Sequence, residues 1–197
     1  MNDIARLAAA ALFLAPLAAC SSPAPTQPAP LAGARIGGPF VLTNQNGRTV
    51  REKDFTGRYR IVYFGYTFCP DVCPTDLQHI GAGLTLFEKA DPRRAAKVVP
   101  IFITVDPARD TAAVLKAYVA AFHPRMVGLT GSPAAIAAVA KGYAVYYRAQ
   151  PATAGGSYMV SHTQAAYLMD PDGMPIALLP AEGPPQGVAD ELGKWVK

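Results

Sequence analysis

Two cysteines four residues apart are the residues of this chain best suited to chemistry. Cys69 and Cys73 are the two cysteines of the sequence Cys-Pro-Asp-Val-Cys-Pro, residues 69–74. A run typical of a buried strand, residues 60–66, precedes them, and a run with helical spacing of apolar residues follows. A helix N-terminus carries partial positive charge and lowers the pKa of a nearby thiol, which favours the thiolate. A thiolate binds soft metal ions or exchanges disulfides, and the pair by itself leaves both functions open.

The first residues of the chain have the composition of a targeting signal, so they are not expected to be part of the folded domain. Residues 7–19 form an apolar run shorter than the roughly 20 residues that a membrane-spanning helix needs. The run ends in Leu-Ala-Ala-Cys, which resembles the lipobox of bacterial lipoproteins. We therefore expect residues 1–19 to be a lipoprotein signal peptide and Cys20 to carry lipid. An ordinary signal peptide and a retained helix are the alternatives, and Pro16 inside the run counts against the helix.

The segment after Cys20 has the composition of a tether. Residues 20–33 are rich in proline and small residues, which keep a chain extended and leave little to bury. A lipid anchor followed by such a spacer would hold a globular domain, residues 34–197, close to a membrane. The expected location is the periplasmic side of a bacterial cell envelope.

The number of cysteines limits their use. There are three, so lipidation of Cys20 leaves Cys69 and Cys73 to pair with each other, to bind a metal, or to do both at different times. In an oxidising compartment such a pair tends to form a disulfide unless something prevents it. The net charge of +4 comes from scattered basic residues, so the sequence shows no nucleic-acid footprint. The charge favours only mild attraction to an anionic membrane or an acidic partner.

Strand and helix patterns alternate along the domain. The predicted strands are residues 40–43, 48–50, 60–66, 98–105, 127–130, 143–148, 164–169 and 175–179. The predicted helices are residues 75–90, 110–122, 133–141 and 187–196. This order indicates an α/β fold of thioredoxin-like type, with a mixed sheet flanked by helices, an added N-terminal β-hairpin and an insertion before the last hairpin. The cysteines fall between the first core strand and its helix, where that fold keeps reactive thiols.

Five segments of the domain resemble the Sco/SenC family of copper chaperones. They are residues 65–74, 104–111, 128–131, 162–163 and 167–173, in the family's order. The resemblance implies that Cys69, Cys73 and His162 bind copper, as Cu(I), Cu(II) or both. It also implies that the protein helps to load the dinuclear copper centre of cytochrome c oxidase. The implied partners are the oxidase subunit that carries this centre and another periplasmic copper carrier.

The donor set suits that implication. Thiolates select Cu(I), imidazole suits either oxidation state, and a site with few ligands lets a partner's ligand enter. His79 is expected to be a partly exposed surface residue and His123 a structural one. The chain departs from the family at Ser161, where an acidic residue usually precedes the histidine, and residues 153–157 also lack an acidic residue. These departures affect groups that would orient His162 rather than a ligand itself.

The two thiols are also compatible with functions other than copper delivery. The main alternative is a membrane-anchored thiol-disulfide oxidoreductase that reduces the cysteines of the oxidase copper site. The CxxxC spacing counts against it, as does the segment of residues 161–163, where thioredoxin-type enzymes usually carry a cis-proline and this chain has a histidine that disulfide exchange does not need. A peroxidase normally has a lone reactive cysteine, and structural zinc takes four ligands where three are visible. Asp71 and Asp106 could support the metal ligands with their carboxylates or contact a partner protein. The simpler roles are that Asp71 caps the loop and that Asp106 starts a turn.

Overall fold

The structure, a computed structural model, describes residues 28–197. The predicted signal peptide (residues 1–19), Cys20 and the first part of the predicted tether lie outside these residues. Within them, no helix has both the length and the hydropathy that a membrane crossing requires.

A mixed sheet of seven strands forms the centre of the domain, in the order β2-β1-β5-β4-β3-β8-β9. The strands are β1 (Val41–Asn44), β2 (Thr49–Arg51), β3 (Tyr59–Gly65), β4 (Val98–Thr104), β5 (Val127–Thr130), β8 (Ala166–Met169) and β9 (Pro175–Leu179). The neighbours β3, β4 and β5 are parallel, and the remaining pairs are antiparallel. β3 and β4 are buried along their whole length, as continuous apolar runs in the middle of a covered parallel sheet are.

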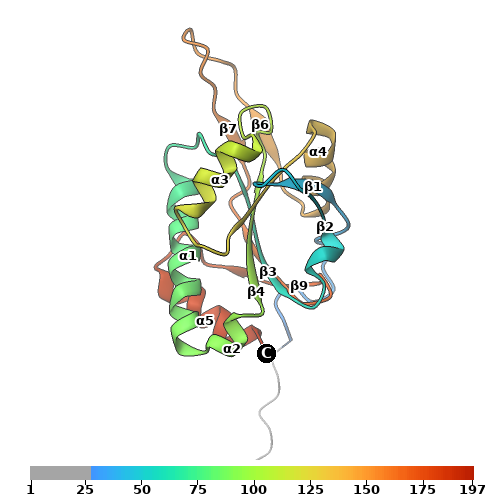
Figure 1. Ribbon diagram of the computed structural model, residues 1–197, viewed down its shortest axis with the longest axis vertical. Helices are drawn as coiled ribbons and strands as arrows, with labels where there is room; N and C mark the ends of the chain where they lie inside the picture. The colour runs from blue at the N-terminus through green and yellow to red at the C-terminus, as the bar shows by residue number, and fades with distance from the viewer. Residues whose placement is uncertain (1–27) are drawn as a thin grey trace, which may run out of the picture.

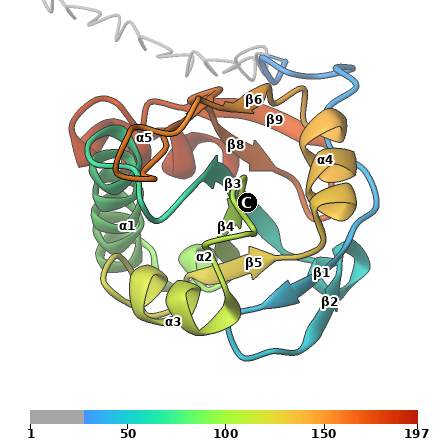
Figure 2. The same cartoon turned by 90° about the horizontal axis from the view of Figure 1, so that it is seen from above.

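Helices cover both faces of this sheet. They are α1 (Val72–Ala90), α2 (Pro92–Ala95), α3 (Ala112–Ala120), α4 (Pro133–Gly142) and α5 (Pro185–Trp195), with a short 3-10 helix, η1 (Glu52–Phe55). Seen from above, α1, α3 and α5 lie on one side and α4 on the other (Figure 2). The apolar side of α1, which includes Leu77, Leu84 and Phe87, is buried. Gly83 lets α5 approach α1, because a Cβ there would lie 2.6 Å from the Cβ of Val188.

The predicted fold class is confirmed, and the differences are shifted element ends and three short elements that were not predicted: η1, α2 and β7 (Val160–His162). α1 begins at Val72 rather than at residue 75, so Cys73 lies inside its first turn. The strand predicted over residues 143–148 is shorter and later: β6 is Tyr147–Ala149. The glycine- and proline-rich segment of residues 150–158, expected from the sequence to be a loop, leads into a strand that the sequence did not indicate. This strand, β7, pairs antiparallel with β6.

The β6–β7 hairpin is a separate two-stranded sheet that projects from the upper end of the molecule (Figure 1). β3 runs towards this end, where it leads into the segment of Cys69. The chain's last residue lies at the other end, because the backbone N–H of Lys197 donates to the hydroxyl of Tyr59, the first residue of β3. The fold therefore places the cysteines and the hairpin with His162 at one end of the sheet.

Candidate metal centre

Three side chains from separate segments meet at this end of the sheet. Cys69 lies in the loop after β3, Cys73 in the first turn of α1, and His162 at the end of β7. Their ligand atoms all lie within 4.8 Å of one another. The Sγ of Cys73 is 3.1 Å from Nε2 of His162, although 89 positions separate them in the sequence. Both cysteines are free thiols in the structure.

The backbone of the cysteine loop is fixed by local hydrogen bonds. The N–H of Cys69 donates to the carbonyl of Tyr66 at 3.2 Å, so the chain turns directly after β3. The N–H of Cys73 donates to the Sγ of Cys69 at 3.5 Å. This bond satisfies one of the free N–H groups of the first turn of α1 and turns the first sulfur towards the second.

Asp110 holds the start of the same loop. Its carboxylate accepts from the N–H of Thr67 at 3.0 Å and from the Thr67 hydroxyl at 2.6 Å. It also accepts from the hydroxyl of Thr104, the last residue of β4, at 2.6 Å. The buried carboxylate thus ties the cysteine loop to the neighbouring strand end.

The ring of His162 is oriented with Nε2 towards the thiols. Nδ1 donates to the backbone carbonyl of Thr163 at 3.0 Å; a carbonyl only accepts, so the proton of the neutral ring lies on Nδ1 and the lone pair on Nε2. The rings of Tyr63 and Tyr66 pack edge-on against the imidazole, at 6.4 and 6.0 Å between centroids. Burial lowers the pKa of His162, which favours the neutral form that binds metal ions.

Burial also decides the state of Cys73. Its side chain is 0% exposed, and this desolvation raises the pKa of the thiol far above its usual range. The expectation that the helix N-terminus would make Cys73 a thiolate is therefore wrong for the metal-free protein, because burial outweighs the helix. A soft metal ion that binds here must displace the thiol proton.

Asp76 is a buried acidic group that the sequence reasoning missed. It is 6% exposed and its carboxylate accepts a hydrogen bond from the hydroxyl of Tyr63 at 2.7 Å. Burial raises the pKa values of both side chains. The signal in the sequence is its spacing, because a residue three positions after Cys73 on a helix lies on the same side.

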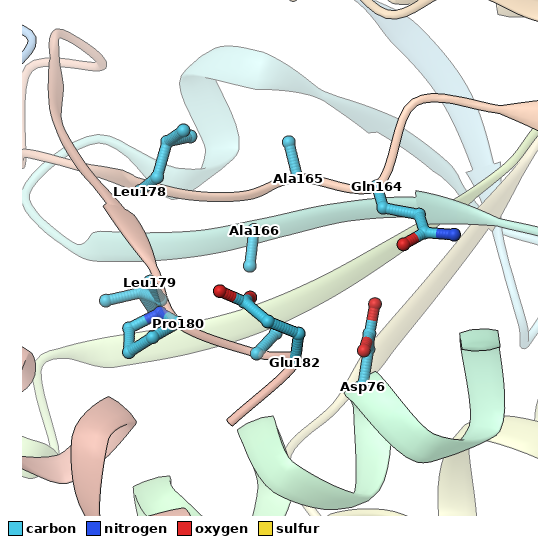
Figure 3. Close-up of a pocket in the computed structure, with 9 residues that line it drawn as sticks. Asp76, Gln164, Ala165, Ala166, Leu178, Leu179, Pro180 and Glu182 are labelled. Carbon is cyan, nitrogen blue, oxygen red and sulfur yellow. The ribbon is translucent and has the colours of Figure 1, made fainter. Parts of the chain in front are cut away.

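Asp76 also borders a cavity of about 330 Å³ (Figure 3). The side chains of Asp76, Gln164 and Glu182 lie around the same hollow, and Ala165 and Leu178 are among its other lining residues. Cys69, Cys73 and His162 are not among the residues that line this cavity. It is therefore a neighbouring space rather than the mouth of the Cys-Cys-His group.

A second cluster, which we call the Arg109 cluster (Phe68, Asp106, Arg109 and Tyr158), joins three loops beside the thiols. Nε of Arg109 donates to the carboxylate of Asp106 at 2.5 Å, and Nη1 donates to the carbonyl of Tyr158 at 3.0 Å. The guanidinium lies 3.6 Å from the ring centroid of Tyr158 and 4.7 Å from that of Phe68. The Tyr158 hydroxyl donates to Asp106 at 2.8 Å. Asp106 is therefore structural, and Asp71, the N-cap residue of α1, makes no side-chain cap hydrogen bond.

The other two histidines lie outside the Cys-Cys-His group. His79 is half-buried, and its Nδ1 donates to the carbonyl of Ala181 at 2.8 Å. His123 is buried, lies 3.4 Å from Glu88, and its Nδ1 accepts from the N–H of Arg125 at 3.2 Å. Each has a structural partner, which agrees with the roles expected from the sequence.

Comparison with protein families and with known proteins gives a consistent result. A family model described as SCO1/SenC matches residues 28–197. The chain is 44% identical over 144 residues to the mitochondrial protein SCO1 homolog 1 of Arabidopsis thaliana, covering 73% of this chain and 42% of that protein. It is 40% identical over 166 residues to the protein SenC of Rhodobacter capsulatus, covering 82% and 71%. The chain spans about half the length of the mitochondrial relatives.

Solved structures share the fold. The copper-bound structure of Bradyrhizobium japonicum ScoI is 44% identical, with a TM-score of 0.73 that covers 81% of this chain and 99% of that one. The thioredoxin domain of a Bacteroides vulgatus thiol-disulfide oxidoreductase is 16% identical, with a TM-score of 0.57 covering 82% and 96%. This second likeness shows the thioredoxin-like fold alone.

Proposed function

Because the chain belongs to the SCO1/SenC family, we propose that it is a copper metallochaperone that binds copper through Cys69, Cys73 and His162. The observation that carries the proposal is the convergence of two sulfurs and one imidazole nitrogen within 4.8 Å. The copper-bound ScoI structure, 44% identical to this chain, supports copper as the metal. Copper is the cargo, delivered to the dinuclear copper centre of cytochrome c oxidase.

The donor chemistry fits this cargo. Two thiolates favour Cu(I) over harder divalent ions, and a neutral imidazole is a third donor that suits both oxidation states of copper. A set of three protein donors leaves room for a ligand of the recipient, which release by ligand exchange requires. Burial of Cys73 keeps water away from the sulfur.

Ser161, where the family usually has an acidic residue, leaves this donor set intact. Its side chain is exposed, and its hydroxyl accepts from Nε2 of Gln150 at 2.8 Å. Neighbouring residues of a strand point to opposite faces, so Ser161 lies on the face of β7 away from the side of His162. The substitution therefore concerns the outer surface of the hairpin.

The partners and the location are part of the same proposal. The recipient is the oxidase subunit that carries the dinuclear centre, and another periplasmic copper carrier would supply the ion. Lipid on Cys20 and the first part of the tether would hold the domain on the periplasmic side of a bacterial membrane. The last part of residues 20–33 belongs to the domain instead, because Leu31 donates its N–H to the carbonyl of Ile176 in β9. The lipoprotein of the same family known from Bacillus anthracis has the same fold at 23% identity.

An anaerobic Cu(I) titration of the reduced protein against a competing chelator tests the proposal. We expect one-to-one binding that Cys69→Ser or Cys73→Ser abolishes and that His162→Ala weakens less, since thiolates dominate for Cu(I). The matched control is His79→Ala, which removes a histidine outside the group and should bind like the wild type. Copper binding that survives both serine variants would place the site elsewhere.

The second candidate is a thiol-disulfide oxidoreductase that reduces the cysteines of the oxidase copper site. The observation that favours it is that both thiols are free and adjacent. In that reaction Cys69 and Cys73 become a disulfide while a disulfide of the recipient becomes two thiols. Weak copper binding that is insensitive to His162, together with rapid exchange with an oxidised recipient peptide, would favour this function.

A further inference from the structure

A methionine sulfur contacts a tyrosine that packs against the Cys-Cys-His group. Met159 directly precedes β7 and stands three positions before His162. Its carbonyl accepts from the N–H of Gln150 at 2.7 Å, which extends the β6–β7 pairing by one residue pair on the side of the loop. The side chain is 46% exposed, unlike the buried Cys73.

Tyr66 connects this sulfur to the group. The buried tyrosine donates its hydroxyl hydrogen to Sδ of Met159 at 3.7 Å. The Cys69 thiol is also close enough to interact with this hydroxyl. The same ring packs edge-on against His162. One side chain thus contacts the thioether through its hydroxyl and His162 through its ring, and lies near the Cys69 thiol.

The chemistry of a thioether differs from that of the two thiols in a useful way. A thioether is a soft donor that binds Cu(I). It has no proton to lose, so it can accept the ion without first being ionised. Its three rotatable bonds also let the sulfur move over short distances. Met159 is therefore an exposed soft donor near a buried site, in the residue directly before the strand that carries the histidine.

We propose that Met159 is an additional, exchangeable thioether ligand for Cu(I), a proposal that rests on the function proposed above. The ion first binds Sδ of Met159 and the sulfur of Cys69. The Cu–Sδ bond then breaks as Cys73 and His162 complete the buried site, and the same steps run in reverse when copper leaves. The steps are ligand exchanges only: copper stays Cu(I), no electron moves, and each thiol gives its proton to solvent as it binds.

Two measurements on the full-length protein test this. With carbon-13 in the methionine methyl groups, the Met159 signal should shift on addition of one equivalent of Cu(I), while that of Met174 should not. Met174 is a matched reference because it is 54% exposed and lies in the β8–β9 turn, far from the thiols. The signals are assigned with Met159→Leu and Met174→Leu, which keep the side-chain volume.

The second measurement is the rate at which the loaded protein gives Cu(I) to a chelator. We expect Met159→Leu to slow this transfer about tenfold, which corresponds to about 1.4 kcal/mol in the barrier. Met174→Leu should transfer at the wild-type rate. An unshifted Met159 methyl signal and wild-type transfer by Met159→Leu, with one-to-one copper binding retained, would overturn the inference and leave Met159 as packing for Tyr66. Absence of copper binding in the wild type would instead overturn the proposed function itself.

Discussion

At the scale of single residues, the missing side chain of Gly65 determines where the Cys73 sulfur can lie. A Cβ on Gly65 would stand 2.9 Å from Sγ of Cys73 and 3.0 Å from the ring of Phe102. Both distances are too short for the packing to accommodate without movement. The last residue of β3 therefore fits the metal group only as glycine.

Gly65→Ala should consequently lower the free energy of unfolding by about 1–3 kcal/mol, as overpacking of a core does. It should also weaken Cu(I) binding, because the Cys73 sulfur is displaced. Urea unfolding and chelator competition measure the two effects. The control is Gly193→Ala, where a Cβ meets nothing within 4 Å and alanine favours the helix. Wild-type stability and copper affinity in Gly65→Ala would contradict the packing argument.

A second prediction at this scale concerns His123 and pH. Burial lowers the pKa of His123 even though Glu88 is close enough to attract its charged form. In the unfolded chain the pKa is about 6.5. Above that pH the ring is neutral in both states and its contribution to stability is complete. As the pH falls through 6.5 towards the lower folded pKa, the unfolded chain gains a proton that the folded protein resists, so stability is lost.

His123→Gln should therefore lose less stability than the wild type when the pH falls from 7.5 to 5.5. The difference between their slopes is at most about 1.4 kcal/mol per pH unit, the limit for one proton. Urea unfolding at a series of pH values measures it. His162 has its pKa lowered too and titrates in both proteins, so the comparison isolates His123. Equal slopes would show that His123 does not carry the effect.

At the scale of elements, the Arg109 cluster fixes the β6–β7 hairpin against the cysteine loop. Its guanidinium contacts Phe68, next to Cys69, and Tyr158, two residues before β7. Lysine offers neither the planar stacking nor the fork of donors that hold these contacts. The position of His162 over the thiols therefore depends on this arginine.

Arg109→Lys should speed amide hydrogen exchange in residues 158–162 and reduce copper affinity towards that of His162→Ala. The loss of stacking and hydrogen bonds should cost about 2 kcal/mol. Arg148→Lys is the control, because Arg148 is an exposed arginine of β6 in the same hairpin. If Arg109→Lys left exchange and copper affinity unchanged, another contact would have to position the hairpin.

The elements also show how far the sequence can be interpreted. β3, β4 and the helices α1, α3, α4 and α5 follow from apolar patterns, and the fold class follows from their order. α1 begins three residues before the predicted start, because the apolar periodicity that indicates the helix begins only at Leu77; Pro74 lies in the first turn, as expected. β7 could not be predicted, since three residues with an exposed serine show no pattern and form a strand only by pairing with β6.

The three proposed ligands were predicted from the sequence, but the residues around them were not. Cys69, Cys73 and His162 came from a motif and a family resemblance, and the structure brings them together. Whether they hold copper is the subject of the titration. Met159 and Arg109 were missed, because their proximity to the thiols depends on how the hairpin docks, and no local pattern encodes that.

At the scale of the whole molecule, copper would link the central domain to the projecting hairpin. A ligand that binds only the folded state stabilises it, by about 2.7 kcal/mol at about 100 times its dissociation constant. For a domain of this size that raises the melting temperature by about 5–10 °C. Thermal unfolding of the protein with and without Cu(I) measures the shift, and Cys73→Ser should show none. A melting temperature of the wild type that is the same with and without Cu(I) would contradict the proposed site.

The placement of the chain ends has a practical consequence. Leu31 donates its N–H to Ile176 of β9, and Lys197 contacts Tyr59, so both segments sit at the end of the sheet where β3 begins. A strand of seven residues, roughly 20 Å, separates that end from the thiols. Immobilised on a sensor chip through its C-terminus, the molecule would present the end of the sheet with the β6–β7 hairpin to the flowing solution (Figure 1). An affinity tag at the C-terminus thus stays clear of the cargo.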